Sequence, residues 1–465
     1  MSSNKQKNER NRVAFFISKY PNDFTTTPDK KLFCKICNKI ITSKKAFHIN
    51  SHIDSECHKK SVQRTAQRVQ TFINVEPKEN KFSDLLLKAF LSANIPLYKV
   101  RNANMKNLFN FMNHPMPSES TLRRSIDNAF DDNLQNIKSI LFHKPIFVIV
   151  DETRKDNVRY ANVLMGILEV PDVVYMVECK EIVEALNGSY ICNLVNSCLL
   201  KMEIELFHFY LLISDAARYM TSAGKMLKSI YNNLFHITCV AHLYHNAAMK
   251  IMSNFIELND FISGMQTVLC KNLTRQQLFI DIKLPPTTVV TRWGSWLKTA
   301  LYYADNFVAV LRIIEEFEDD GKIVARVKTL AKNVTIKKQM VNIASNYVPL
   351  INLIEKSEKM VYSIKSAYHD IINLKIDIDE CGIHQYMLTR LEGGDIRRIM
   401  SMENETINPS IYAMLLNSQA TSIMVERSFS MLKKICADDR NFAAGNLGKY
   451  LILYYNYMSS DIDNK

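Results

Sequence analysis

The sequence has little that would interrupt helices and nothing that indicates export. Only 11 Gly and 12 Pro occur among 465 residues, well below average usage, so long helices with few interruptions are expected. No run of 18 apolar residues is present, so no membrane partner is expected, and the polar segment 1–12 is unlike a secretory leader. The ten Cys are therefore expected to be reduced thiols in an intracellular protein.

Acidic residues are scarce at the N-terminus. Residues 1–70 contain 15 Lys or Arg and 5 Asp or Glu, a net charge of +10, while the whole chain carries +12. The length allows two or three domains, and a hydrophobic content of 47% is ordinary for a globular protein. So local an excess of positive charge is most simply explained by binding to nucleic-acid phosphates, and no small-molecule substrate is expected.

Four side chains in this basic segment have the spacing of a structural zinc site. Cys34-Lys-Ile-Cys37 would form a tight knuckle, and His52 and His58 would complete a tetrahedron from a helix expected over residues 43–67. The six-residue step between the two His is longer than usual and requires a distortion of that helix. His48 and Cys57 are competing ligands. The basic side chains available to phosphates here are Lys44, Lys45, Lys59, Lys60 and Arg64.

The pattern changes after residue 144. Residues 145–150 are a continuous apolar run, which predicts a strand buried on both faces and ending at Asp151. Further strands are predicted at 158–168, 173–182, 207–214 and 235–240, and helices at 188–200, 216–232 and 241–252. Asp215 follows the fourth strand. If the first and fourth strands are neighbours, Asp151 and Asp215 face each other at one edge and could share divalent metal ions.

Five short motifs occur in order in the rest of the chain. They are Ile149-Val-Asp-Glu-Thr153, Ile213-Ser-Asp-Ala216, Cys239-Val-Ala-His242, Thr291-Arg-Trp293 and Val425-Glu-Arg-Ser-Phe-Ser430. Together they resemble the hAT superfamily of DNA transposases and proteins derived from them, and the resemblance covers about residues 142–456. Residues 12–125 are similar to the CGG triplet repeat-binding protein, a nuclear DNA-binding regulator of transcription. The matching stretches are Lys31-Leu-Phe-Cys34, Ser92-Ala-Asn-Ile-Pro-Leu97 and Thr121-Leu-Arg-Arg124.

The resemblance implies a mixed α/β fold, with an RNase H-like sheet, a helical insertion and a small N-terminal zinc finger. Asp151, Asp215 and Glu426 match the acidic triad that binds magnesium in the family. Cys239, His242, Arg292 and Trp293 match positions beside the DNA. The implied divisions are a flexible basic arm (1–30), a BED-like zinc finger (31–68), a linker with helices (69–141), the first part of the RNase H-like domain (142–299), the insertion (300–415) and the completing helices (416–465).

Simpler explanations exist for some of these residues. Either Asp151 or Asp215 alone would more often cap a helix than bind metal. Cys239, His242 and His245 are spaced along one helical face, so either a second zinc site or a packed Cys with hydrogen-bonded His is possible.

Two functions follow from the sequence. One is a nuclear, transposase-derived protein that binds double-stranded DNA and regulates transcription; the other is an active Mg-dependent transposase. A homo-oligomer is expected in both cases, because Glu426 lies in a predicted helix (418–436) that, with the apolar stretch 447–455, could support self-association. A scaffold that binds only proteins is disfavoured by the concentration of positive charge at the N-terminus.

Overall fold

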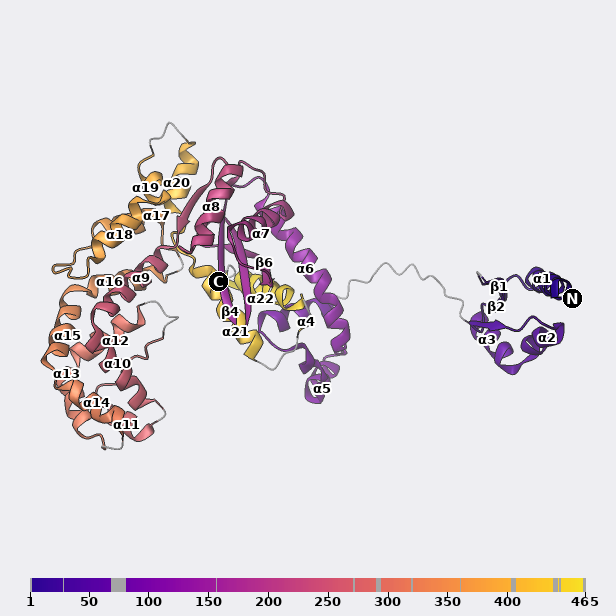
Figure 1. Ribbon diagram of the computed structural model, residues 1–465, viewed down its shortest axis with the longest axis horizontal. Coiled ribbons are helices and arrows are strands. Elements are labelled where there is room, and N and C mark those ends of the chain that lie inside the picture. Colours follow the sequence, from indigo (N-terminus) through magenta and orange to yellow (C-terminus); the bar gives the residue numbers. More distant parts are fainter. Residues whose placement is uncertain are drawn as a thin grey trace. The chain divides into compact units, whose positions relative to one another are not determined.

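In the computed structural model the chain divides into two compact units, Met1–Asn80 and Lys81–Lys465 (Figure 1). The structure describes all residues except 1, 28, 68–80, 156, 271, 290–293, 319–320, 360, 403–406, 438–441, 443–444 and 463–465. Within those described residues, we find no helix with the length and apolar character that crossing a bilayer requires.

The first unit is built around a small antiparallel sheet whose strand order is β1-β2-β3. A helix precedes the sheet and two helices follow it. In chain order the elements are α1 (Ser2–Lys19), β1 (Phe24–Thr26), β2 (Leu32–Cys34), β3 (Lys39–Ile41), α2 (Ala46–Asp54) and α3 (Glu56–Gln67).

The prediction of a flexible arm at residues 1–30 was wrong. Val13 and Phe16 of α1 are buried in one core with Phe24, Leu32 and Ile49. Arg12 also donates a hydrogen bond to the carbonyl oxygen of Ser43, at 2.8 Å. The described part of this segment is therefore largely a helix that packs into the core of the first unit.

The second unit contains a mixed five-stranded sheet with the order β6-β5-β4-β7-β8. The strands β4, β5 and β6 form an antiparallel meander, and β7 and β8 continue the sheet parallel to β4. Their bounds confirm the predicted order of strands and helices: β4 (Ile146–Lys155), β5 (Val158–Ile167), β6 (Val174–Ile182), α7 (Gly188–Lys201), β7 (Phe209–Ser214), α8 (Arg218–Ile230), β8 (Phe235–Thr238) and α9 (Val240–Asn254).

Strand β4 is buried on both faces, as its continuous apolar run predicts. Ile146 and Val148 face a core shared with α7 and α8, whereas Phe147 and Ile149 face the larger core on the other side of the sheet. The helices that precede the sheet are α4 (Lys81–Ser92), the 3₁₀ turn η1 (Leu97–Arg101), α5 (Ala103–Phe111) and α6 (Glu119–Leu141). All of them pack on the larger core, and α6 also contributes to the smaller one.

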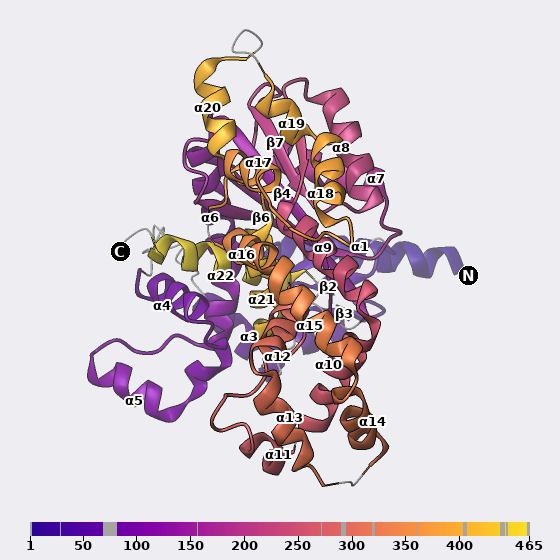
Figure 2. The same ribbon diagram turned by 90° about the vertical axis from the view of Figure 1, so that its left-hand side faces the viewer.

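A helical lobe lies to the left of the sheet in Figure 1, and in the turned view of Figure 2 it lies in front of the sheet and below it. It begins before the predicted boundary at residue 300, because α10 packs on α14 and α15, and α12 packs on α15. The helices from here to residue 417 are α10 (Ile256–Leu269), α11 (Leu273–Gln277), α12 (Ser295–Asp305), α13 (Phe307–Glu315), α14 (Lys322–Ala331), α15 (Val334–Asn346), α16 (Val348–Ser357), α17 (Ile364–Ile372), α18 (Ile383–Glu392), α19 (Asp395–Met400) and α20 (Pro409–Asn417).

The chain then returns to the sheet through α21 (Ile423–Ala437) and α22 (Asn446–Ile462). Helix α22 packs on β6, α4 and α6, and the Asn456 side chain accepts a hydrogen bond from the Met176 backbone N–H at 2.8 Å. Residues Tyr450 to Tyr455 are buried. The apolar stretch that was expected to support self-association is therefore used inside the chain, so it no longer supports the prediction of an oligomer.

Candidate metal centres

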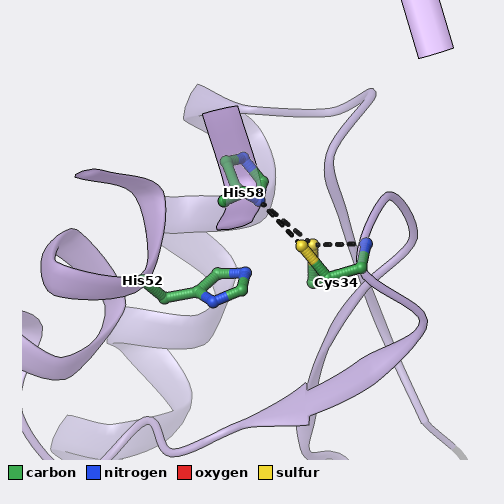
Figure 3. Close-up of side chains that lie close together, drawn as sticks. Cys34, His52 and His58 are labelled. Carbon is green, nitrogen blue, oxygen red and sulfur yellow. Dashed lines mark hydrogen bonds between the residues drawn. The ribbon is translucent and has the colours of Figure 1, made fainter. Parts of the chain in front are cut away.

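The four predicted zinc ligands meet in the first unit. Cys34 ends β2, Cys37 lies in the turn after it, His52 is on α2 and His58 is on α3 (Figure 3). Their ligand atoms all lie within 4.8 Å of one another. His58 Nδ1 is 3.6 Å from Cys34 Sγ and 3.3 Å from Cys37 Sγ. The competing ligands His48 and Cys57 are both exposed and lie outside this group.

A break in the helix accommodates the long sequence separation of His52 and His58. The single helix predicted over 43–67 is interrupted at Ser55, whose backbone is extended (φ −64°, ψ 141°). The Ser55 hydroxyl donates to the His52 carbonyl oxygen at 2.6 Å and accepts from the His58 backbone N–H at 3.3 Å. The second helix can therefore start in a new direction, which brings His58 back to the thiols.

The surroundings of these ligands fit a bound metal. Two thiols and two imidazoles are the donor set of structural zinc sites. His52 Nε2 is buried and has no hydrogen-bond partner in the structure, which fits a ligand role. Burial, with the neighbouring His58 and Lys39, lowers the pKa of His52 and so favours the neutral imidazole that metals bind. Burial and the adjacent Cys34 raise the pKa of the Cys37 thiol, so metal binding would displace a proton there.

Asp23 supports His58 from behind. Its Oδ2 lies 3.9 Å from His58 Nε2, on the side of the ring opposite the two sulfur atoms. A carboxylate behind a metal-binding imidazole can help to orient the ring. Sequence analysis missed this residue, because nothing in the turn before β1 distinguishes Asp23 from other surface acids.

Basic side chains surround this site. Lys44, Lys45, Lys59 and Lys60 are all exposed. Lys60 pairs with Glu56 at 3.1 Å, one turn earlier on α3. The side chain of Arg64 lies outside the described residues. The four described lysines are thus accessible to a polyanion.

A second group of possible ligands gathers at the sheet of the other unit. Asp151 on β4, His242 on α9 and Glu426 on α21 have ligand atoms within 4.8 Å of one another. Asp151 is 3% exposed; its Oδ1 accepts from the Glu152 backbone N–H at 2.7 Å, and its Oδ2 has no hydrogen-bond partner. Glu426 Oε1 lies 3.7 Å from His242 Nε2. Two carboxylates therefore face one imidazole.

The charges in this group are interdependent. Burial raises the pKa of Asp151 well above its usual value, and the charges of Glu426 and Asp215 add to that rise while His242 opposes it. Burial also raises the pKa of Glu426. Burial disfavours a charge on His242, but Cys239, Asp151 and Glu426 outweigh it and raise the pKa of His242 to about 10. Cys239 is the largest of these three raising influences, so the positive charge of a protonated His242 is balanced by Cys239 as well as by the two acids.

Asp215 lies close by but is not part of this group. The predicted strand arrangement is present, since β4 and β7 are parallel neighbours and Ile149 pairs with Ile213. Strand β4 continues straight past Asp151, whereas β7 ends at Ser214 and the chain turns. In that turn Asp215 Oδ1 accepts from the Ala217 backbone N–H at 3.1 Å. The carboxylate therefore caps its own turn, and His242 takes the third place in the group.

Cys239, Arg292 and Trp293 were also predicted to lie beside DNA. Cys239 is only 1% exposed, and its sulfur accepts from the Ser422 backbone N–H at 3.2 Å, so the prediction that it contacts DNA was wrong. This bond holds the start of α9 against the segment before α21. Arg292 and Trp293 lie outside the described residues. His245 is not part of either ligand group, so the structure gives no second zinc site on α9 among its described residues.

Comparison of the sequence with models of protein families and with curated proteins finds no match.

Proposed function

We propose that this chain is a nuclear DNA-binding protein derived from a hAT-type transposase, and that it regulates transcription through its N-terminal zinc module. The carrying observation is the convergence of Cys34, Cys37, His52 and His58 within 4.8 Å in a compact unit of its own. Residues 1–70 of the chain also carry most of its net positive charge, +10 of +12. A structural metal site in a strongly basic small unit is the usual arrangement of a nucleic-acid reader.

The exposed lysines identify the part of the unit that meets DNA. Lys44 and Lys45 lie directly before α2, and Lys59 and Lys60 lie on α3 directly after the last zinc ligand. Zinc would fix both helices relative to the sheet, and so would fix these charges relative to one another. Each phosphate neutralised contributes a slope of about −0.9 to the dependence of log affinity on log salt.

A charge-matched comparison tests this proposal. The variant Lys44→Gln/Lys45→Gln of the full chain should bind duplex DNA more weakly and with a salt slope shallower by roughly 2. The control Lys337→Gln/Lys338→Gln removes two exposed lysines from α15 in the other unit and should behave as the wild type. Equal losses in both variants would show that net charge alone, and not the zinc module, carries the binding.

The second unit supports the proposed transposase origin. If its five strands are numbered along the chain, their order across the sheet is 3-2-1-4-5. The second strand is antiparallel to its neighbours, and the fourth and fifth are parallel to the first. This is the arrangement expected of an RNase H-like sheet, and Asp151 stands where the resemblance puts a metal-binding acid. We propose that this sheet now serves as a platform for assembly on DNA.

The alternative is an active transposase that cleaves and joins DNA strands with magnesium. The observation in its favour is the gathering of Asp151, His242 and Glu426. The donor set fits magnesium poorly, because Mg²⁺ takes oxygen ligands and this group has two carboxylates and one imidazole, with Asp215 outside it. We therefore favour the binding protein over the enzyme.

One assay separates the two functions. Supercoiled DNA is incubated with Mg²⁺ and either the wild type or Asp151→Ala. No nicking above background by the wild type is expected if the chain only binds DNA. Nicking that requires Asp151 would replace the first proposal by the second.

A further inference from the structure

A third group of metal-ligating side chains lies at the end of the sheet opposite Asp151. His143, Glu205 and His208 have ligand atoms within 4.8 Å of one another. His143 lies between α6 and β4, and the other two lie between α7 and β7. Because β4 and β7 are parallel, both connections enter the sheet at the same edge. The strand from Ile146 to Asp151 alone separates this edge from the other group by roughly 16 Å.

The carboxylate of Glu205 lies between the two imidazoles. Its Oε1 is 3.1 Å from His143 Nδ1, and its Oε2 is 3.1 Å from His208 Nδ1. Ligands bound to one zinc ion at about 2.0–2.1 Å in a tetrahedron lie roughly 3.4 Å apart. The present spacing is therefore close to that of a metal site, and small side-chain rotations would suffice to complete one.

The backbone holds the three residues in place. The His208 backbone N–H donates to the Glu205 carbonyl oxygen at 3.0 Å, so the two side chains come from a single turn. The His208 carbonyl oxygen accepts from the Ile146 backbone N–H at 2.8 Å, which ties this turn to the start of β4. His143 has a left-handed backbone (φ +54°), a conformation that residues other than Gly rarely adopt.

We propose that His143, Glu205 and His208 bind one divalent transition-metal ion of the zinc class. Two imidazoles and a carboxylate favour such an ion over magnesium or calcium. The side chains of His143, Glu205 and His208 are 55%, 37% and 19% exposed, so water can reach the remaining coordination position. The metal would join the α6–β4 and α7–β7 connections. This site is independent of the zinc module and of DNA binding.

The competing explanation is a hydrogen-bonded staple, in which both imidazoles donate to Glu205 and no metal is involved. Glu205→Gln distinguishes the two. Its amide oxygen can still accept a hydrogen bond from an imidazole, but a neutral amide is a much poorer zinc ligand than a carboxylate. His143→Asn removes the imidazole at a position where Asn tolerates the left-handed backbone. His369→Ala, at an exposed histidine outside all three groups, is the control.

The experiment measures the zinc bound by the full chain as a function of free Zn²⁺. The zinc module is unchanged in every variant, so differences in stoichiometry report on this site. The wild type and His369→Ala should bind one equivalent more than Glu205→Gln and His143→Asn, or bind that equivalent at least about tenfold more tightly. Equal binding by all four proteins would overturn the proposal.

A local measurement covers the case in which a variant is misfolded. In the wild type, Zn²⁺ should slow amide hydrogen exchange in residues 142–146 and 203–209. In Glu205→Gln it should leave exchange there unchanged. Zinc that fails to slow exchange in the wild type, or slows it equally in Glu205→Gln, would also reject the site.

Discussion

His242 Nε2 lies 3.7 Å from Glu426 Oε1, although the whole helical lobe separates the two residues in the sequence. Asp151, buried beside both, completes the group. Gathered carboxylates repel one another unless a positive charge lies among them. A protonated His242 provides that charge, so this group can exist without a metal ion.

This relationship predicts how stability depends on pH. The pKa of His242 is about 10 in the folded chain against an ordinary value of 6.5. A raised pKa of a base means that its charge stabilises the fold fully below pH 6.5, and that this contribution is lost as the pH rises through about 10. The wild type should therefore exceed His242→Gln in free energy of unfolding by an amount that shrinks toward pH 10.

Urea denaturation in EDTA across this pH range measures the difference. His369→Gln, at an exposed histidine, should show no such trend. A difference between wild type and His242→Gln that stays constant or grows with pH would mean that His242 is not the counter-charge.

Removal of zinc should unfold the first unit alone. Among its described residues, the buried core consists of seven hydrophobic side chains, so metal ligation is expected to supply much of its folding free energy. With EDTA, residues 8–62 should lose protection from hydrogen exchange while the sheet strands of residues 146–182 keep theirs. Cys34→Ser should reproduce this loss without chelator. A first unit that stays protected after chelation would show that its core suffices.

Asp23 should tune the zinc site without binding the metal. Asp23→Asn removes the carboxylate behind His58 and leaves all four ligands in place. Loss of such a supporting group typically costs about 10–100-fold in metal affinity. Competition against a chelator of known affinity measures it. Asp29→Asn, at an exposed acid between β1 and β2, should bind zinc as the wild type does.

The strands and the four zinc ligands could be predicted because their signals are local. Residues 145–150, which precede Asp151, are all apolar, and a strand with this pattern is buried on both faces wherever it lies in a fold. The spacing of Cys34 and Cys37 likewise depends only on neighbouring residues. The α1 helix was missed although Val13, Phe16, Ile17 and Tyr20 follow helical spacing, because the surrounding charges suggested a solvated arm.

The composition of the second group could not be predicted, because it depends on the direction of single turns. The sequence places Asp151 and Asp215 at equivalent strand ends, but not the turn in which Asp215 caps the backbone of Ala217. The partnership of Glu205 with His143 is equally hidden, since it joins two connections that only the parallel pairing of β4 and β7 brings together. Local sequence patterns predict helices and strands. Which side chains gather into one group can be predicted only when the tertiary structure is known as well.

A fully buried hydrogen-bonded pair joins α21 to the sheet. Asn162, which lies opposite Asp151 on β5, donates from Nδ2 to Ser428 Oγ at 2.7 Å, and both residues are 0% exposed. Ser428 follows Glu426 by two residues on α21, so this bond helps to set where Glu426 lies. Asn162→Ala should destabilise the second unit by about 1–3 kcal/mol, because a buried hydrogen bond is lost. The Ser428 hydroxyl then keeps only its hydrogen bond to the Val425 carbonyl oxygen.

Two measurements on Asn162→Ala separate stability from positioning. Urea denaturation gives the loss of stability, and the exposed Asn193→Ala on α7 should show none. If Asn162 also positions Glu426, the pKa of His242, followed by NMR in the folded state, should fall from its raised value as Glu426 moves away. An unchanged pKa of His242 in a destabilised variant would mean that Val240, whose N–H donates to the Ala420 carbonyl oxygen at 2.9 Å, and Cys239 hold α21 in place without Asn162.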